Sequence, residues 1–508
     1  MWEPTDNYGK AIKKFKKIIE DKYNIKFDNF WDLHQWSIDY IPEFWAELWE
    51  FSGIIYSKKF DKVIDLSIPL ENRPEWFTGA KLNLAENLLK FRDDRIALIA
   101  TGEHGCVEKI SYAELYKEAE LYAAAFRKFG LKKGDVVTCQ MSNRKEAILG
   151  MIAVTSIGGI WAGALPLLGA KAVLNRFQQV DPKIFLTIDQ VCQDKKREDM
   201  LPKIKEITEG LPSLEKVIIV ESNEKSQSRD ISGIKNSCFL KDFLRLGVNE
   251  DGSVPQIQFE QISFSDPVFV SYTSGTTGLP KALVHGVGYL FPVYRDFELH
   301  FDTDRDSVWY SMSPVGWATW NCFSSLIFTG STVLLFDGSP YFLTPTYFWD
   351  LIDEHNISHV FIPSSVVDEL QKRNYVPSSK MGQVQKVWQG FCMYGLSAQA
   401  GTARRKTAAA AFKGAARSQN AFGTYFSMEV KESKEKQPVV SGRPATKLSI
   451  KRPQTYKQMG AGDGPHAGKW YFKAAQRQIL QVGGTEPKQV SNLVLWCKCK
   501  SLPIKLYG

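Results

Sequence analysis

The chain has 508 residues, of which 44% are hydrophobic and 13% aromatic, which is enough for a large buried core and two or more domains. Its eight cysteines are too few for a disulfide framework in so long a chain and favour a reducing, cytoplasmic setting. The net charge of +8 is uneven, because residues 391–508 hold 20 Lys and Arg against 5 Asp and Glu, which leaves 44 and 51 in residues 1–390.

The first predicted element is an amphipathic helix over residues 8–23. Ile12, Phe15, Ile19 and Tyr23 fall on one face of it, with lysines opposite. Such a helix can lie on a membrane surface, but we favour a terminal helix docked on the body of the protein. The tryptophan-rich segment 30–51 is expected to pack a small N-terminal lobe, residues 1–95, onto that body.

From residue 96 the pattern alternates between strand and helix. Ser111 with Glu114 forms a capping box at the start of one helix, and Gly130 is suited to its end. The alternation predicts an α/β fold with a doubly wound, mostly parallel sheet over residues 96–385. The expected strands are 95–100, 135–141, 158–166, 183–188, 268–272, 331–336 and 359–365, and the expected helices 111–131, 143–157, 171–180 and 346–356.

Residues 147–170 contain no charged side chain and are long enough to span a membrane. Gly158, Gly159 and Pro166 interrupt the run, which favours a buried helix, a break and a buried strand. We expect no membrane span there. Residues 221–262 are polar and are predicted to form an irregular loop.

The stretch 268–286 carries the strongest chemical signal. It reads "VFVSYTSGTTGLPKALVHG", a strand followed by a loop whose glycines let backbone N–H groups approach an anion. Hydroxyl groups and Lys281 complete what we interpret as a cradle for polyphosphate, although an ordinary Gly/Thr turn is the alternative. It is not a Walker A loop, because Pro280 precedes the lysine and Ala282 follows it. The segment after the lysine is expected to continue as a helix.

Three histidines are weaker candidates. His355 and His359 are four residues apart, a spacing that can bind metal on one helix. We expect the first to end a helix and the second to start a strand, so no metal site is predicted. His285 is as well suited to a structural hydrogen bond as to contact with a substrate.

The loop "YTSGTTGLPKALVHG" resembles the phosphate loop of the adenylate-forming superfamily. The segments at 76–89, 143–166, 172–189, 313–321 and 357–370 resemble acetyl- and acetoacetyl-CoA synthetases. The early segment 33–51 is most similar to acetoacetyl-CoA synthetases. The resemblance covers roughly residues 10–375.

The resemblance implies a two-step reaction, in which a carboxylate attacks the α-phosphate of ATP and coenzyme A then displaces AMP. ATP, Mg²⁺ and coenzyme A are the implied cofactors and co-substrates, and acetoacetate is the preferred acid. Small molecules are the only implied partners, with no nucleic acid. The residues implied at the phosphates are Thr273, Ser274, Gly275, Thr276, Thr277, Gly278 and Lys281, of which Thr277 and Lys281 are candidate catalytic residues. Gly316, Trp317, Ala318 and Thr319 are implied along the acyl pocket, where a packed core turn is the alternative.

The region 386–508 departs from the family pattern. Its low hydrophobicity and high charge favour disorder, and the family's Thr-Glu, ribose-binding aspartate and C-terminal lysine motifs are not recognisable in it. We therefore expect weak or no activity in the full reaction, and hypothesise that this tail is translated out of the family's frame. A basic arm for an acidic partner, another short-, medium-chain or aryl acyl-CoA ligase, and a non-catalytic nucleotide-binding remnant remain alternatives.

Overall fold

The computed structural model describes residues 9–69, 72, 74–193, 195–273, 279–339, 347–363, 386–390 and 504–506. All of these belong to one compact unit of the chain. Most of the predicted tail, and residues 274–278 of the predicted phosphate loop, lie outside them.

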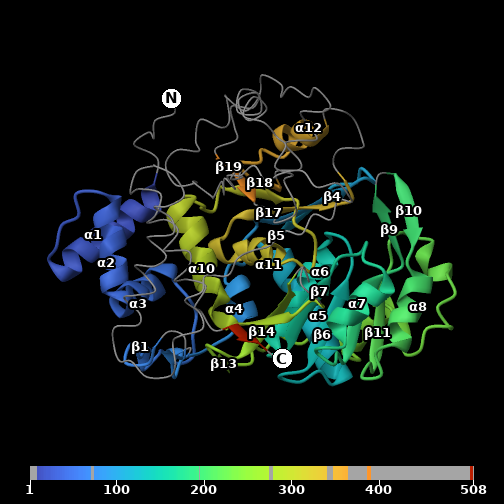
Figure 1. Cartoon of the computed structure of the whole chain (residues 1–508). Coiled ribbons are helices and arrows are strands. Elements are labelled where there is room, and N and C mark those ends of the chain that lie inside the picture. Colours follow the sequence, from blue (N-terminus) through green and yellow to red (C-terminus); the bar gives the residue numbers. More distant parts are fainter. Residues whose placement is uncertain are drawn as a thin grey trace, which may run out of the picture. The chain divides into compact units, whose positions relative to one another are not determined.

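Three helices begin the described chain, and two of them cover the aromatic segment 30–51 (Figure 1). They are α1 (Lys10–Tyr23), α2 (Phe30–Asp39) and α3 (Ile41–Ser52). Helix α1 buries Phe15 and Ile19 completely, so its apolar face is docked as expected. Trp49 of α3 packs the lobe onto the body, because its ring centroid lies 5.3 Å from that of Phe291.

The larger sheet has eight strands in the order β12-β11-β8-β6-β7-β14-β15-β20. The strands from β12 to β14 are parallel, whereas β15 is antiparallel to β14 and to β20. Their bounds are Val136–Gln140 (β6), Ile160–Ala164 (β7), Ile184–Ile188 (β8), Lys216–Val220 (β11), Ser237–Phe239 (β12), Pro267–Tyr272 (β14), Ala282–Gly286 (β15) and Ile504–Leu506 (β20).

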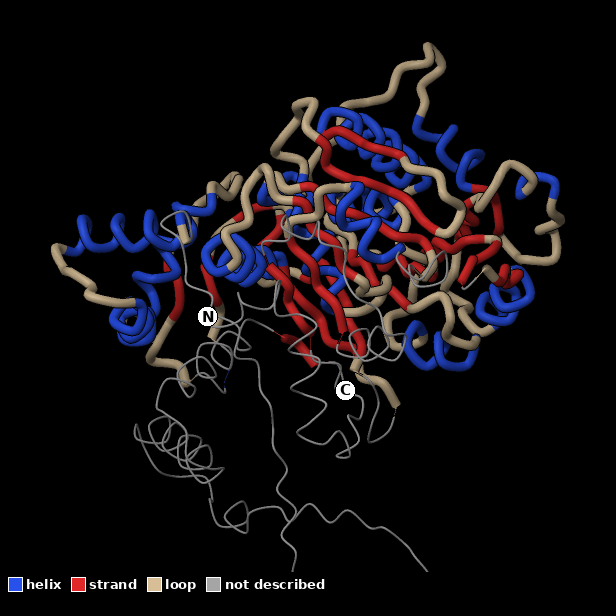
Figure 2. Tube along the Cα trace, turned by 90° about the horizontal axis from the view of Figure 1, so that it is seen from above, coloured by secondary structure: helices blue, strands red, loops and turns tan. Residues whose placement is uncertain are grey.

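Helices cover both faces of this sheet (Figure 2). On one face lies α6 (Lys145–Ser156), whose Gly150 approaches Trp161 and Leu186 so closely that a Cβ atom there would clash. On the other lies α7 (Ala170–Phe177), where the Phe177 ring is 5.9 Å from that of Phe185. Further helices are α8 (Leu201–Glu209) and α9 (Leu240–Leu244).

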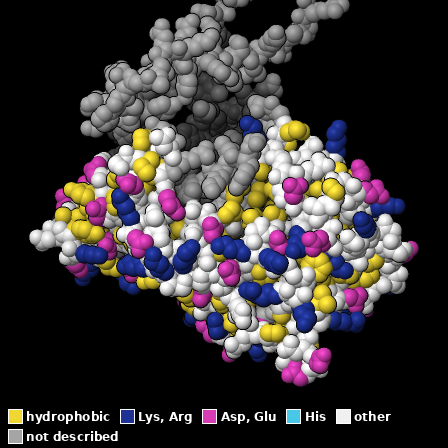
Figure 3. Space-filling model, turned by 90° about the horizontal axis from the view of Figure 1, so that it is seen from below, with side chains coloured by type: hydrophobic (Ala, Val, Ile, Leu, Met, Phe, Trp, Pro, Cys, Tyr) yellow, Lys and Arg dark blue, Asp and Glu magenta, His cyan; other side chains and the backbone are white. Residues whose placement is uncertain are grey.

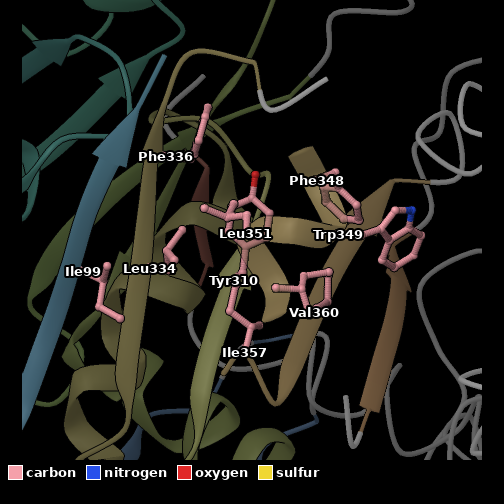
Figure 4. Close-up of a cluster of buried hydrophobic side chains, with 10 residues drawn as sticks. Ile99, Tyr310, Leu334, Phe336, Phe348, Trp349, Leu351, Ile357 and Val360 are labelled. Atoms are coloured by element: carbon pink, nitrogen blue, oxygen red, sulfur yellow. The ribbon is translucent and has the colours of Figure 1, made fainter. Parts of the chain in front are cut away.

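The second sheet has six strands in the order β19-β18-β16-β17-β4-β5, and only β5 is antiparallel to its neighbour. Helix α12 packs on it through a buried cluster that includes Phe348, Leu351 and Tyr310 (Figure 4). The elements are Ile96–Gly102 (β4), Glu108–Ser111 (β5), Val308–Ser311 (β16), Thr332–Asp337 (β17), His359–Pro363 (β18), Lys386–Gly390 (β19) and Tyr347–Glu354 (α12).

Two helices connect the sheets, one through α6 and the other by direct contact with a strand of each sheet. Helix α5 (Tyr112–Phe129) packs against α6 as well as β4 and β5, and α11 (Ala318–Ser324) contacts β14 and β16. Strand β2 (Trp76–Thr78) pairs with β1 (Lys62–Ile64). Further elements are Lys81–Leu82 (β3), Leu84–Leu88 (α4), Gln190–Gln193 (β9), Lys196–Asp199 (β10), Ile262–Ser263 (β13), Leu290–Tyr294 (α10) and a π-helix, Arg295–His300.

The α/β class and the mostly parallel strands are confirmed, with three differences in detail. The strands separate into two sheets, which local alternation cannot distinguish. Residues 282–286 form strand β15 rather than a helix, because they pair with β14. The expected loop 221–262 contains β12 and α9. Across the described residues, no helix is long and apolar enough to cross a membrane, and 147–170 divide into α6 and β7.

Basic and acidic side chains are interspersed on the face shown in Figure 3. That mixture agrees with the near balance of charge in residues 1–390. A surface on which both signs are interspersed has no large field of one sign.

Candidate active site

The predicted phosphate loop connects the antiparallel strands β14 and β15, and its two ends are held together at the base. The Thr273 N–H donates to the Lys281 carbonyl over 3.0 Å, and the Lys281 N–H donates to the Thr273 hydroxyl over 2.9 Å. Gln179, just after α7, donates to the Pro280 carbonyl (2.9 Å) and accepts from the Ala282 N–H (3.1 Å). The loop therefore starts and ends at fixed points, with Lys281 exposed beside them.

A second loop, residues 312–317, crosses the carboxyl end of β7 at very short range. A Cβ atom on Gly316 would lie 2.7 Å from the Cα of Ala164, and one on Gly163 would lie 2.8 Å from the Cα of Gly316. Gly316 also has φ of +96°, which L side chains rarely adopt. Ligands of parallel α/β sheets bind at this end of the strands, so the loop is well placed for one.

The predicted acyl-pocket residues follow directly at the start of α11. Trp317 is 37% exposed and Ala318 is exposed, so both can contact a ligand. The Thr319 hydroxyl lies 2.5 Å from the Ser313 hydroxyl, and Asn143, after β6, donates to the Ser313 carbonyl over 3.1 Å. The Thr319 side chain therefore mainly stabilises the 312–317 loop.

Tyr289, which sequence reasoning missed, ties this segment to the hairpin. Its hydroxyl donates to the Ala318 carbonyl over 2.8 Å and lies 2.8 Å from the Cys322 sulfur. Burial raises the pKa of Tyr289 well above its usual value and raises that of Cys322 to about 12. Both groups are therefore neutral at pH 7. Asn321 donates to the Ser271 hydroxyl over 3.3 Å and fixes α11 to β14.

His285 lies on β15 beside this cluster. Its ring centroid is 5.2 Å from that of Tyr289, and burial lowers the pKa of His285 to about 4, so the imidazole is neutral at pH 7. Within the described part of the chain, its buried Nε2 has no hydrogen-bond partner. The side chain thus has hydrogen-bonding capacity that the protein itself does not use.

An ion pair connects the carboxyl ends of the two sheets. Arg144, after β6, contacts Asp337 at the end of β17 over 3.0 Å and Glu146 over 3.2 Å. Burial opposes the charge of Arg144, but the two carboxylates outweigh it and raise the pKa of the guanidinium. The guanidinium therefore stays charged, and its contact with Asp337 joins the two sheets beside the 312–317 loop.

The structure brings together part of the predicted site. Thr273 and Lys281 meet at the base of the loop, and Gly316–Thr319 lie against the hairpin through Tyr289 and α11; Ser274, Gly275, Thr276, Thr277 and Gly278 lie outside the described residues. No signal in the sequence had singled out Tyr289 or Asn321, because each acts on a residue distant in the chain.

The two spaced histidines belong to different elements. His355 follows the end of α12, whereas His359 begins β18, where its ring nitrogens lie 2.8 Å from the Ser358 hydroxyl and 3.0 Å from the Phe301 carbonyl. Among the residues that the structure describes, no group of three or more His, Cys, Asp or Glu side chains could hold a metal ion.

The sequence pattern of the AMP-binding enzyme family matches residues 84–425, and that of the acetyl-coenzyme A synthetase N-terminus matches residues 30–88. Acetoacetyl-CoA synthetase from Macaca fascicularis is 37% identical over 380 residues, which are 74% of this chain and 56% of that protein. Malonamoyl-CoA synthetase vrtB from Penicillium aethiopicum is 28% identical over 400 residues, covering 75% of this chain and 55% of that protein.

Among solved structures, acetoacetyl-CoA synthetase from Streptomyces lividans superposes with a TM-score of 0.69 at 27% identity, over 76% of this chain and 59% of that one. The chain thus spans little more than half the length of the relatives it matches. Because the family pattern extends over most of this chain and includes both site loops, the chain belongs to the AMP-binding enzyme family.

Proposed function

We propose that this chain binds ATP and uses it to activate acetoacetate, first as an acyl-adenylate with release of pyrophosphate and then as the thioester of coenzyme A with release of AMP, at a low rate because the later family motifs are not recognisable in residues 386–508. The observation that carries the proposal is the 37% identity to an acetoacetyl-CoA synthetase over 380 residues. ATP and coenzyme A are substrates in this scheme. The proposal further names acetoacetate as the acid.

The two loops would have different roles. The amides and hydroxyls of residues 273–278 would hold the β- and γ-phosphates, and the exposed Lys281 ammonium would reduce their negative charge. The acid itself is the nucleophile, so catalysis needs positioning and charge stabilisation rather than an activated side chain. Trp317 and Ala318 would contact the acyl group. Mg²⁺ would accompany the nucleotide and share the negative charge of its phosphates; among the described residues, no cluster of three or more His, Cys, Asp or Glu side chains would hold it independently of the nucleotide.

The names of two relatives agree on one chemical feature. Acetoacetyl and malonamoyl groups both have a second carbonyl group on C3 of the acyl chain. A short acid with an oxygen at that position is therefore the substrate class that we favour over simple fatty acids. Other acyl-CoA ligase activity and nucleotide binding without turnover remain the alternatives.

The proposal also divides the chain into an N-terminal lobe (1–95), a partial adenylation domain (96–385) and a basic tail (386–508).

The test combines ATP binding with pyrophosphate release. The full chain would be titrated with ATP by calorimetry and assayed with acetoacetate, acetate, butyrate and benzoate. Acetoacetate-dependent pyrophosphate release supports the proposal; preferred turnover of another acid supports the first alternative, and ATP binding without release supports the second. Lys281→Ala should weaken ATP binding, whereas Lys235→Ala, at an exposed position between β11 and β12, is the control.

A further inference from the structure

His285 faces the interior of the two-sheet body from the same side as the candidate acyl pocket. Val270 and Val284 are opposite each other across the hairpin and pack with Ala162 in a core cluster on the α7 side. Because side chains alternate along a strand, His285 and its partner Phe269 lie on the opposite face. That face carries α11, since Asn321 of α11 reaches Ser271 there.

Tyr289 links the His285 side chain to the acyl-pocket segment, residues 316–319. The ring of His285 is 5.2 Å from the ring of Tyr289, and the Tyr289 hydroxyl donates to the Ala318 carbonyl over 2.8 Å. The single hydroxyl proton of Tyr289 is donated to Ala318. The Cys322 thiol is therefore the donor in its hydrogen bond with the Tyr289 oxygen. The Tyr289 hydroxyl thus has two partners, whereas the His285 Nε2 has none among the described residues.

The position along the strand fits the far end of a short acid. His285 is four residues beyond Lys281 on the same side of the hairpin, about 13 Å along an extended strand. An acid whose carboxylate points to the phosphate loop would direct the other end of its chain toward His285. A buried nitrogen without a partner is unfavourable, which makes a ligand oxygen at this point favourable.

We propose that His285 determines the acid specificity of this site by donating a hydrogen bond from Nε2–H to the oxygen on C3 of the acyl group. The inference rests on the proposed function, because it names the group that would recognise a 3-oxo acid. A neutral imidazole suits this role, since it can donate to a ketone or amide oxygen without attracting a second carboxylate. His285 would be a specificity-determining residue and take no part in the transfer of the adenylyl group.

The experiment measures binding by the full 508-residue chain, independent of turnover. Two non-hydrolysable acyl-sulfamoyl adenosines, one acetoacetyl and one butyryl, differ in the C3 oxygen and are titrated by calorimetry. The ratio of their dissociation constants is compared among wild type, His285→Phe, His285→Gln and Tyr272→Phe. Tyr272 is the matched control, because its hydroxyl is also buried without a partner among the described residues but its ring faces Phe177 of α7.

The expected result is a loss of about 3- to 10-fold in the preference for the acetoacetyl analogue in His285→Phe, the range for one neutral hydrogen bond. His285→Gln should keep part of the preference because its amide can donate, and Tyr272→Phe should keep all of it. In ¹⁵N-histidine spectra of the wild type, which do not depend on the fold of any variant, the acetoacetyl analogue should shift the His285 Nε2 signal more than the butyryl analogue does.

Two negative outcomes are distinguishable. Binding of both analogues with an unchanged ratio in His285→Phe, or equal Nε2 shifts with both, would overturn the role of His285 and leave the proposed function standing. Binding of neither analogue to the folded wild type would overturn the proposed function together with the inference.

Discussion

Replacing Gly316 by alanine tests whether the 312–317 loop is held against β7 by backbone contact. The substitution has two separable costs. A residue with a Cβ at φ of +96° loses roughly 1–2 kcal/mol, and the new methyl would sit 2.7 Å from three backbone atoms of Gly163 and Ala164. Overpacking of this kind costs roughly 1–3 kcal/mol. The expected total is therefore about 2–5 kcal/mol of unfolding free energy.

Two other glycines separate these costs. Gly130 has nearly the same φ, +97°, but no heavy atom lies within 4 Å of the point that an alanine methyl would occupy, so Gly130→Ala should cost only about 1–2 kcal/mol. Gly163→Ala has the clash, at 2.8 Å from Gly316, without a positive φ, and should cost about 1–3 kcal/mol. Urea unfolding of the three variants, followed by tryptophan fluorescence, measures all three values. Equal losses in Gly316→Ala and Gly130→Ala would show that close packing on β7 is not what fixes the loop.

Three further substitutions have expected outcomes. Asn83 is fully buried and donates to the carbonyls of Thr155 and Glu260, so Asn83→Ala should lower the unfolding free energy by about 3 kcal/mol; a loss below about 1 kcal/mol in urea would contradict this. Arg144→Met leaves the 7%-exposed Asp337 without its guanidinium and should cost about 3–5 kcal/mol, part of which the double variant with Asp337→Leu should recover. Burial raises the pKa of Glu298 from 4.5 to about 7, so its contribution to stability is present below the unfolded pKa and is lost as pH rises toward 7. Glu298→Gln should therefore be more stable than wild type at pH 8, by at most about 3 kcal/mol, and the gain should shrink toward pH 5; a thermal-melting difference that is constant with pH would refute this.

The sequence predicts best where the determinants are local. Ser111, Glu114 and Gly130 lie within one helix and its caps, and the structure shows the capping box and the left-handed glycine at those positions. Residues 282–286 were expected to continue as a helix after Lys281. Pairing with β14 makes these residues a strand, and a short segment of sequence does not reveal that pairing.

The site divides in the same way. The phosphate loop is recognisable because its glycines, hydroxyls and lysine are contiguous in the sequence. The contacts of Tyr289 with Ala318 and of Arg144 with Asp337 join residues from separate elements. The separation of the strands into two sheets likewise depends on the distant pairing of Leu98 with Val333, which no local pattern contains.

That distant pairing has a consequence for biosynthesis. The ribosome delivers β4 early, but its parallel neighbour β17 emerges only after the strands of the larger sheet from β6 to β15 have been made. Until then one long edge of β4 has no neighbour, and such edges are open to pairing with other chains. Nascent chains that stall between these two strands should therefore depend on chaperones more than chains that stall after β17.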